Sequence, residues 1–435
     1  MIFPWLPFGL LFLVPFVDPR RPLRLLHLDL VVLLVIGIWP LRASLGTEPP
    51  AWTAAVTVAG LIYLLVRLLR YGFRPGPTRG PLVPLVPVAW LAVAVVAVGG
   101  LRIASLFVRP AYPSDVGVAT VIGADRIGKG QGLYDGGLGR VWRHSDTYGP
   151  VMYLSYVPFE QAWPWTGGVT AETFRPPRSA RVAAATFDLL TLLGLFLLGR
   201  RLRAGPEGTL LGWALAFAWV SYPYSLLVLR FSFNDCLVGL TALASLLALR
   251  SPAGRGALTA IAAATKFAPA VLAPLLATGT GERRLRSSLL FAVAFALVTV
   301  AVFVPFIPDG GLHELYDRTI GFQELRRGWV RIWASVPGLD WLQTICQVLV
   351  AGLALLVAFV PRRKTPAQVT ALAGALIIAV QLVSRNWSAA YALWFAPLAF
   401  AGLFAECDSR PRAPVPVWSR RRRRRQVGAA DVIRA

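Results

Sequence analysis

The sequence predicts an all-α, polytopic transmembrane protein with about ten spanning helices, a broken helical hairpin and two long extracytoplasmic loops. Of its 435 residues, 56% are hydrophobic and only 15% are charged, whereas a soluble domain averages about 25% charged residues. Apolar runs of roughly 16 to 27 residues recur from end to end, and each is long enough to cross a hydrocarbon core of ~30 Å. Clusters of arginine separate these runs.

The apolar segments follow one another along the whole chain. They lie at about residues 2–17, 28–44, 52–69, 82–108, 179–199, 208–229, 233–249, 257–277, 285–306, 338–360, 366–383 and 388–405. Basic clusters lie between or after them, at Arg20/Arg21/Arg24, Arg67/Arg70/Arg74/Arg79, Arg200/Arg201/Arg203, Arg250/Arg255, Arg283/Arg284/Arg286, Arg362/Arg363/Lys364 and Arg420 to Arg425.

The distribution of charge predicts the orientation. The chain has 44 Lys and Arg against 21 Asp and Glu, a net charge of +23. Short loops rich in arginine stay in the cytoplasm. Placing all the basic clusters inside predicts a multi-pass protein of the cytoplasmic (inner) membrane, with its N-terminus outside and its C-terminus in the cytoplasm. Membrane lipids then account for the basic tail, and we expect no nucleic-acid partner.

One segment, 257–277, has cytoplasmic flanks on both sides and must therefore cross an even number of times. Its sequence is interrupted in the middle, at Ala264–Pro269. We expect two short half-helices that enter and return, with Lys266 near the turn. Broken helices at membrane depth are tolerated where they line a cavity.

This topology divides the chain into four parts. They are the N-terminal transmembrane helices (1–108), an extracytoplasmic loop (109–178), a transmembrane core (179–405) with a second outer loop (307–336), and a disordered basic cytoplasmic tail (406–435). Ten of the 21 carboxylates fall in the two outer loops, so we expect any chemistry at the outer surface. Aromatic residues between Tyr148 and Trp165 suggest interfacial helices in the first loop, the alternative being an ordinary packed loop.

The sequence argues against a protein-bound metal. The histidines His27, His144 and His313 lie far apart, and the three cysteines are isolated from one another. Neither HExxH nor CxxC spacing occurs. We therefore assign no metal-ligating residues and leave a divalent cation open as a cofactor.

Several short motifs follow one another along the chain. In the first outer loop Asp115 precedes a helical stretch, Gly130-Gln131-Gly132-Leu133-Tyr134 follows it, and Tyr148-Gly149-Pro150 comes next. Further along are Asn234-Asp235, Lys266-Phe267-Ala268-Pro269 and Tyr391-Ala392-Leu393-Trp394. In this order, over roughly residues 100–405, the chain resembles membrane glycosyltransferases of the GT-C class, in particular glycosyltransferase family 87.

The resemblance implies a GT-C-like fold and a polyprenyl-phosphate-dependent hexosyltransferase. It implies transfer of a hexose, mannose by preference, from a polyprenyl-phosphate sugar to an outward-facing lipid or glycan acceptor. Asp115 would be the general base that removes the acceptor hydroxyl proton, and a single displacement inverts the anomeric centre. Judged from the residues alone, Asp115 could instead cap the helix that follows it.

Other charged and polar residues are candidates for the site. Arg230, Lys266 and Arg327 could hold the donor phosphate, although Lys266 could instead stabilise the hairpin and Arg327 could rest on lipid headgroups. Asp188 lies two helical turns after Arg181, so it either forms an ion pair there or supports the active site. The remaining supporting candidates are Tyr134, Asp146, Tyr148 and Asn234.

Two other classes of function stay open at this point. A transporter or flippase of lipid-linked sugars would share the broken helix and Lys266, but it would favour an inverted repeat. The acidic outer loop 109–178 has no inverted counterpart in the sequence. A membrane scaffold without catalytic activity is the third alternative.

Overall fold

The structure, a computed structural model, describes residues 5–37, 52–76, 80–108, 110–141, 145–168, 174–281, 284–325, 333, 338–385 and 387–408. Over these residues every regular element is a helix. Extended backbone pairs there in a single isolated bridge, between Pro81 and Asp408. The all-α prediction is confirmed. The predicted basic tail from residue 409 onward lies outside the described residues.

The elements of the N-terminal half fall into two groups. The N-terminal helices are α1 (Trp5–Leu13), η1 (Val14–Phe16), α2 (Leu25–Val35), α4 (Trp52–Phe73) and α5 (Val88–Val108). The first long loop contains α6 (Asp115–Gly128), α7 (Gly137–Val141), α8 (Pro150–Leu154) and α9 (Val157–Ala162).

The remaining elements form the core and the second long loop. They begin with α10 (Arg178–Leu202), α11 (Gly205–Ser221), α12 (Pro223–Arg230), α13 (Asp235–Leu247), α14 (Pro252–Thr265), η2 (Ala268–Leu272), α15 (Ala273–Thr278) and α16 (Arg284–Phe303). They continue with η3 (Val304–Phe306), α17 (Gly311–Tyr316), η4 (Asp317–Gly321), α18 (Phe322–Leu325), α19 (Asp340–Phe359), α20 (Pro366–Val383), η5 (Ala389–Tyr391) and α21 (Ala392–Phe404).

Six described helices, α4, α5, α10, α16, α19 and α20, are long and apolar enough to cross a membrane, and counting α11 with α12 gives seven. The chain is therefore a multi-pass membrane protein. Among the described residues, helix length and apolar composition thus support six or seven of the roughly ten predicted spans. Several of the predicted segments form apolar helices of only 10–17 residues.

The segment 208–229 shows why apolar length alone overcounts spans. It is divided at Tyr222 into α11 and α12, whose axes differ by 57°. Tyr222 has φ −70° and ψ 121°, because the ring of Pro223 drives the preceding residue out of the helical conformation. One apolar run thus becomes two short helices.

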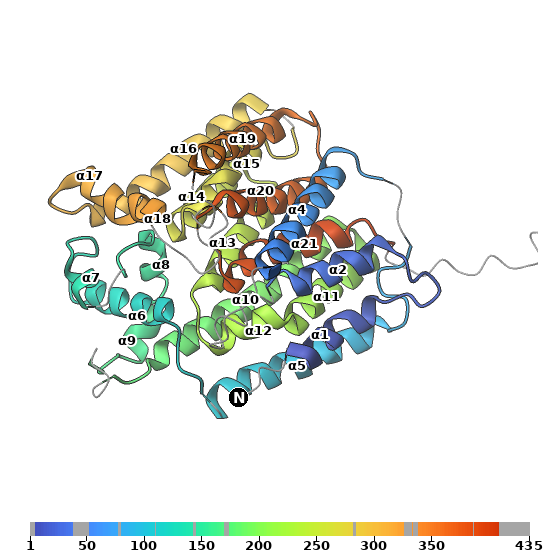
Figure 1. Ribbon diagram of the computed structural model, residues 1–435, viewed down its shortest axis with the longest axis horizontal. Helices are drawn as coiled ribbons and strands as arrows, with labels where there is room; N and C mark the ends of the chain where they lie inside the picture. Colours follow the sequence, from blue (N-terminus) through green and yellow to red (C-terminus); the bar gives the residue numbers. More distant parts are fainter. Residues whose placement is uncertain are drawn as a thin grey trace, which may run out of the picture.

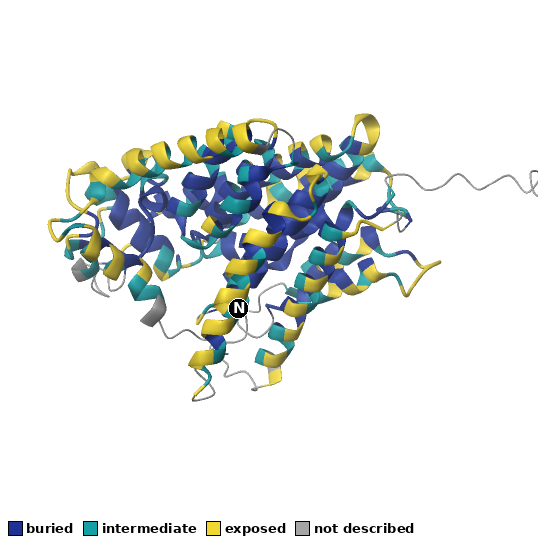
Figure 2. Cartoon of the chain, turned by 90° about the horizontal axis from the view of Figure 1, so that it is seen from above, coloured by how far each residue is buried: buried dark blue, intermediate teal, exposed yellow. Residues whose placement is uncertain are grey.

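The centre of the helical bundle consists of α13, α20 and α21. Every residue of α21 is buried, as are most residues of α20. At the periphery, α16 and α19 expose large apolar side chains such as Leu285, Leu297 and Val348. Figure 2 shows this division, with exposed residues along the outer helices and buried residues between them. Apolar outer faces of this kind are expected where helices contact lipid.

The segment 257–277 folds back on itself. Helix α14 ends at Thr265, and Lys266 takes an extended conformation with φ −141° and ψ 144°. The chain then returns through η2 and α15. Arg255, in the first turn of α14, donates from Nε to the Leu276 carbonyl near the end of α15 at 2.8 Å. The two ends of this helical hairpin therefore lie together, and Lys266 lies at its tip.

The two long loops lie at the same end of the molecule (Figure 1). An ion pair joins them, because Arg318 Nη1 donates to Asp146 Oδ2 at 2.9 Å. In the first loop, Met152, Tyr153 and Tyr156 are fully buried, and α8 and α9 pack against α6, α10 and α14. This burial favours the packed-loop alternative over interfacial helices for these residues.

Candidate active site

Lys266, at the tip of the helical hairpin, is the centre of the candidate site. Its side chain is buried, with 7% of the residue exposed. Its Nζ donates to Asp235 Oδ1 at 2.7 Å, and Trp394 Nε1 donates to the same oxygen at 2.7 Å. Asp235 is the first residue of α13 and Trp394 lies in α21. Three separate elements thus meet at one carboxylate.

Aromatic rings surround the ammonium group. Lys266 Nζ lies 4.9 Å from the ring centroid of Tyr148, 5.6 Å from that of Tyr391 and 5.1 Å from that of Trp394. Ring faces attract cations. The side-chain amide of Gln381 donates to the Tyr391 carbonyl at 2.9 Å, which helps to position that ring. The cation is therefore held by one carboxylate and three aromatic side chains. We call these five residues, Lys266, Asp235, Tyr148, Tyr391 and Trp394, the lysine cluster.

A cavity of about 200 Å³ lies beside the lysine cluster. The side chains that line it are Thr147, Tyr148, Lys266, Phe267, Ala268, Ile320, Gln323, Val380, Gln381, Ser384, Tyr391 and Trp394. These residues come from the first long loop, the hairpin tip, the second long loop, the end of α20, η5 and the start of α21. Gln323 Nε2 also donates to the Thr147 carbonyl at 3.3 Å. Both loops therefore line the same pocket, whose walls are partly polar and partly apolar.

Gly149 allows the first loop to approach the hairpin. A Cβ atom at this position would lie 2.0 Å from the Ala264 carbonyl oxygen, a distance that backbone atoms cannot accommodate. Since Tyr148 precedes Gly149 directly, the absence of a side chain here lets the Tyr148 ring lie over Lys266.

Asp115 is the first residue of α6 and is exposed. Its Oδ1 accepts a hydrogen bond from the Val116 backbone N–H at 2.8 Å. The helix is capped by Ser114 instead, whose Oγ accepts from the Gly117 N–H at 3.2 Å. Ser114 is therefore the N-cap, and Asp115 follows it in the first turn, where its carboxylate also accepts a helix N–H.

The helix that carries Asp115 packs against the turn between α12 and α13. The Ser114 N–H donates to the Phe231 carbonyl at 2.7 Å, and Asn234 Nδ2 donates to Thr120 Oγ1 at 2.9 Å. Arg230 and Asp235 lie at the two ends of this turn. Asp115, Arg230, Asn234 and Asp235 are thereby brought to one region of the molecule.

This turn is conformationally strained. Ser232 has φ +50°, and among the described residues it is the only non-glycine residue with positive φ. A Cβ atom at Gly117 would lie 2.2 Å from the Ser232 carbonyl oxygen, so the glycine is needed for α6 to approach. Strain of this kind persists where the surrounding structure enforces it, and it often clusters at functional sites.

A family model for glycosyltransferase family 87 matches residues 147–384. The match covers more than half of the chain. The chain belongs to glycosyltransferase family 87. A search of curated proteins gave no match.

Family 87 membership makes the chain a membrane glycosyltransferase, as the sequence resemblance implied, and decides against the transporter and scaffold alternatives. The matched residues include Tyr148, Asp235 and Lys266, which lie within 147–384. Asp115 and Trp394 fall outside the matched residues. The structure nevertheless brings Trp394 into the lysine cluster and the helix of Asp115 against the α12–α13 turn.

Two further candidates in the family 87 chain support the first loop. Tyr134 Oη donates to the Tyr148 carbonyl at 2.6 Å. Burial, and secondly the charge of Asp146, raise the pKa of Tyr134 well above its ordinary value, so the phenol stays protonated and remains a donor. Asp146 itself accepts from Arg318.

Arg318 joins the two loops through carboxylates on either side. Besides Asp146, it binds Glu314, with Nη2 to Oε1 at 2.7 Å. Burial lowers the pKa of the Arg318 guanidinium, but its hydrogen bonds and charge interactions with Glu314 and Asp146 outweigh this and raise the pKa above its ordinary value. The link between the loops therefore has a permanently charged centre.

Asp188 does not pair with Arg181. Its Oδ1 accepts from Arg102 Nη2 at 3.0 Å and from Trp219 Nε1 at 2.9 Å. All three groups are buried, and they join α5, α10 and α11. Arg102 lies closer in space although it is 86 residues away in the sequence, which spacing along one helix could not reveal.

The sequence-predicted residues are thus only partly brought together. The lysine cluster contains Lys266 and Tyr148, Tyr134 supports it, and Arg327 lies outside the described residues. Asp235 was not selected from the sequence as a site residue. The sequence does contain a sign of its role, because a lysine inside an apolar segment requires a counter-ion and Asp235 begins an apolar segment.

Within the described residues no group of three or more His, Cys, Asp or Glu side chains could hold a metal ion.

Proposed function

We propose that this family 87 enzyme transfers a hexose, mannose by preference, from a polyprenyl-phosphate sugar to an outward-facing lipid or glycan acceptor. The observation that carries the proposal is the lysine cluster. A buried cation lies beside a cavity that two long loops cover, next to the turn that holds the helix of Asp115.

The donor phosphate would bind at Lys266. The ammonium group has three N–H donors, and one of them is directed to Asp235. Asp235 and the aromatic rings keep the ammonium in place before the donor arrives, and a phosphate oxygen in the cavity would then bind a cation that needs no rearrangement. Apolar lining residues such as Phe267 and Ile320 suit the first prenyl units of the donor.

The size of the cavity limits what it holds. Its volume of about 200 Å³ is below the ~300–1,000 Å³ typical of sites that enclose a whole small-molecule ligand. We therefore assign it to the phosphate end of the donor. Arg230, and Arg327 beyond the described residues, would supply further positive charge to that end.

Asp115 would act as the general base. The carboxylate is exposed at the start of α6, where an acceptor hydroxyl can reach it. Loss of the hydroxyl proton to Asp115 would accompany attack on the anomeric carbon, while the polyprenyl phosphate leaves with its negative charge bound by Lys266. A single displacement of this kind inverts the anomeric configuration.

The proposed membrane orientation rests on the basic clusters, which lie in short loops between the apolar segments. With these loops in the cytoplasm, the lysine cluster faces outward. Thiol labelling of intact cells tests this orientation. Asp135→Cys in the first loop should react with a membrane-impermeant reagent, whereas Arg363→Cys should react only after the cells are lysed. The reverse pattern would exclude an outward-facing site.

The chemical proposal is tested with purified enzyme, polyprenyl-phosphate-mannose and candidate acceptors. Asp115→Asn should lower the transfer rate by roughly 10²–10⁴-fold, the usual contribution of general-base catalysis. Asp125→Asn is the matched control, because Asp125 lies on the same helix and forms only a surface pair with Lys129 at 2.7 Å. If Asp115→Asn retained the rate of the control while folding equally well, Asp115 would not be the base.

A further inference from the structure

A second cavity, of about 750 Å³, lies at the opposite end of the bundle from the lysine cluster. Helix α20 begins beside this second cavity at Pro366, and its far end supplies Val380 and Gln381 to the pocket next to Lys266. With 18 residues, α20 is about 27 Å long. The two cavities are therefore separated by nearly the thickness of a bilayer core. We call the second one the basic cavity.

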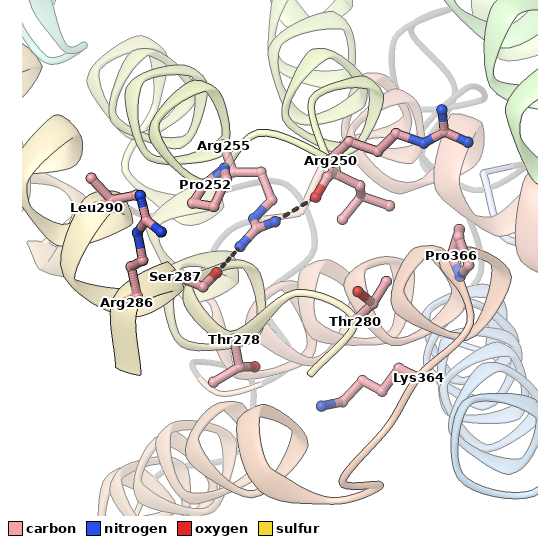
Figure 3. A pocket seen from close by; sticks show the side chains of 11 residues that line it. Arg250, Pro252, Arg255, Thr278, Thr280, Arg286, Ser287, Leu290, Lys364 and Pro366 are labelled. Carbon is pink, nitrogen blue, oxygen red and sulfur yellow. Dashed lines mark hydrogen bonds between the residues drawn. The ribbon is translucent and has the colours of Figure 1, made fainter. Parts of the chain in front are cut away.

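Among the described residues, the basic cavity is lined by four cations and by no carboxylate. Figure 3 shows Arg250, Arg255, Arg286 and Lys364 around it. Arg255 joins the two ends of the helical hairpin, with Nε donating to the Leu276 carbonyl of α15 at 2.8 Å. It also links the hairpin to α16, with Nη2 donating to Ser287 Oγ at 2.6 Å. Arg250 and Arg286 are exposed, and their side chains can follow a ligand.

Three helices also begin at the basic cavity. Pro252 is the first residue of α14, Arg286 lies in the first turn of α16, and Pro366 is the first residue of α20. Each helix N-terminus carries a partial positive charge. A cation such as Arg286 in the first turn is unfavourable there, unless an anion lies between the charges. Helix N-termini and arginines are both features of anion-binding sites.

The position of the basic cavity indicates a lipid as the source of the anion. Leu290 of α16 lines the cavity and is 43% exposed. Leu285, Leu289 and Leu297 continue this exposed apolar face along α16. An anionic headgroup in the cavity would therefore leave its acyl chains free to lie along α16 within the bilayer.

We propose that the basic cavity binds the phosphate headgroup of an anionic membrane lipid. The rule that places arginines in cytoplasmic loops requires only that cations lie near the membrane surface. This rule does not explain why residues after α13, before α16 and before α20 line the same cavity. Nor does it explain why three helices begin there. Basic pockets between transmembrane helices on the cytoplasmic side bind lipid headgroups elsewhere.

The test measures lipid binding to the purified full chain by native mass spectrometry in neutral detergent. Phosphatidylglycerol should bind more tightly than phosphatidylcholine. The double variant Arg250→Gln/Arg286→Gln should weaken phosphatidylglycerol binding roughly thirtyfold, because each cation near a membrane surface contributes about 1 kcal/mol. The control Arg74→Gln/Arg363→Gln removes the same charge from exposed positions that do not line the cavity, and it should bind as the wild type does.

Three results would overturn the proposal. The first is an equal loss in the two double variants, which would mean diffuse attraction only. The second is equal binding of the neutral lipid. The third is displacement of the lipid by millimolar inorganic phosphate, which would identify a soluble phosphate as the ligand.

A second measurement needs no variant, in case the Arg250 and Arg286 substitutions impair folding. A photoactivatable phosphatidylglycerol analogue should cross-link the wild-type chain on α16 near Leu290. Cross-links confined to other helices would contradict the proposed site.

Discussion

Two buried ion pairs in this molecule have a similar construction, with an aspartate, a basic side chain and a tryptophan in each. Asp235 pairs with Lys266 and Asp188 pairs with Arg102. In each pair one carboxylate oxygen also accepts a hydrogen bond from a tryptophan indole, at 2.7 Å in the first and 2.9 Å in the second. Each pair joins different helices. Neither pairing nor burial distinguishes them.

Their surroundings are different. Lys266 lies at a helix end, with aromatic faces around it and a cavity beside it. Arg102 lies within α5 and is among the largest fully buried side chains. Its Nη1 donates to the Trp219 carbonyl at 3.2 Å, so the two terminal nitrogens of the guanidinium join α5 to α10 and α11. A cation at a helix break is available to a ligand, whereas a cation in the middle of a packed helix contributes to the fold.

The largest expected effect is a difference in transfer activity between variants of the two ion pairs. In the double variant Lys266→Met/Asp235→Asn, transfer per folded molecule should fall on the order of 10²–10³-fold, the usual cost of removing one preorganised donor from the reacting anion. In the matched variant Arg102→Met/Asp188→Asn it should stay within a few-fold of wild type. Both retain a side-chain oxygen for the indole and remove both charges, so neither leaves a buried charge unpaired.

Transfer assays normalised to the monodisperse fraction from size-exclusion chromatography measure this difference. If the Arg102 and Asp188 variant lost as much activity as the other, the distinction between a binding pair and a structural pair would be wrong.

The second effect concerns stability. Asp188→Asn alone leaves Arg102 charged and fully enclosed, so it should destabilise the chain by about 3–5 kcal/mol, and addition of Arg102→Met should recover most of that loss. Asp235→Asn should cost less, because Lys266 keeps its aromatic neighbours and water can reach it from the cavity. Thermal unfolding in detergent measures all three variants. Equal losses for the two single substitutions would show that the cavity does not solvate Lys266.

The sequence predicts the helical class and the order of segments well, because apolar runs and arginine clusters are local features. It predicts the number of spans less well. The bend at Tyr222 depends on one proline inside an apolar run, and a hydropathy pattern does not register it. The extended conformation at Lys266 was easier to anticipate, because a lysine and a proline interrupt the run at neighbouring positions.

The candidate site is less predictable, because its contacts connect residues far apart in the sequence. Lys266 and Trp394 can be selected individually, but their common partner Asp235 becomes evident only when α13, α14 and α21 are packed together. The partner of Asp188 lies on another helix for the same reason. Periodicity identifies which residues share a helix face, and it carries no information on the neighbouring helix that this face contacts.

The smallest effect tests how far the two long loops contribute to the lysine cluster. Asp146→Asn removes the ion pair between the loops, in which Arg318 is 30% exposed and Asp146 is 9% exposed at the side chain. Pairs that water reaches contribute up to about 1 kcal/mol. We expect the KM for the donor to rise roughly fivefold while kcat changes little, because in the proposed function the two loops cover the site of the donor phosphate.

Glu314→Gln is the matched control, since Glu314 binds the same Arg318 but from within the second loop. Its KM should stay close to that of wild type. The effect of Asp146→Asn should also shrink at high salt, which weakens this partly exposed ion pair in the wild type. A fall in kcat instead of a rise in KM would mean that Asp146 acts on the transfer step itself. The link between the loops would then belong to the catalytic site together with Lys266.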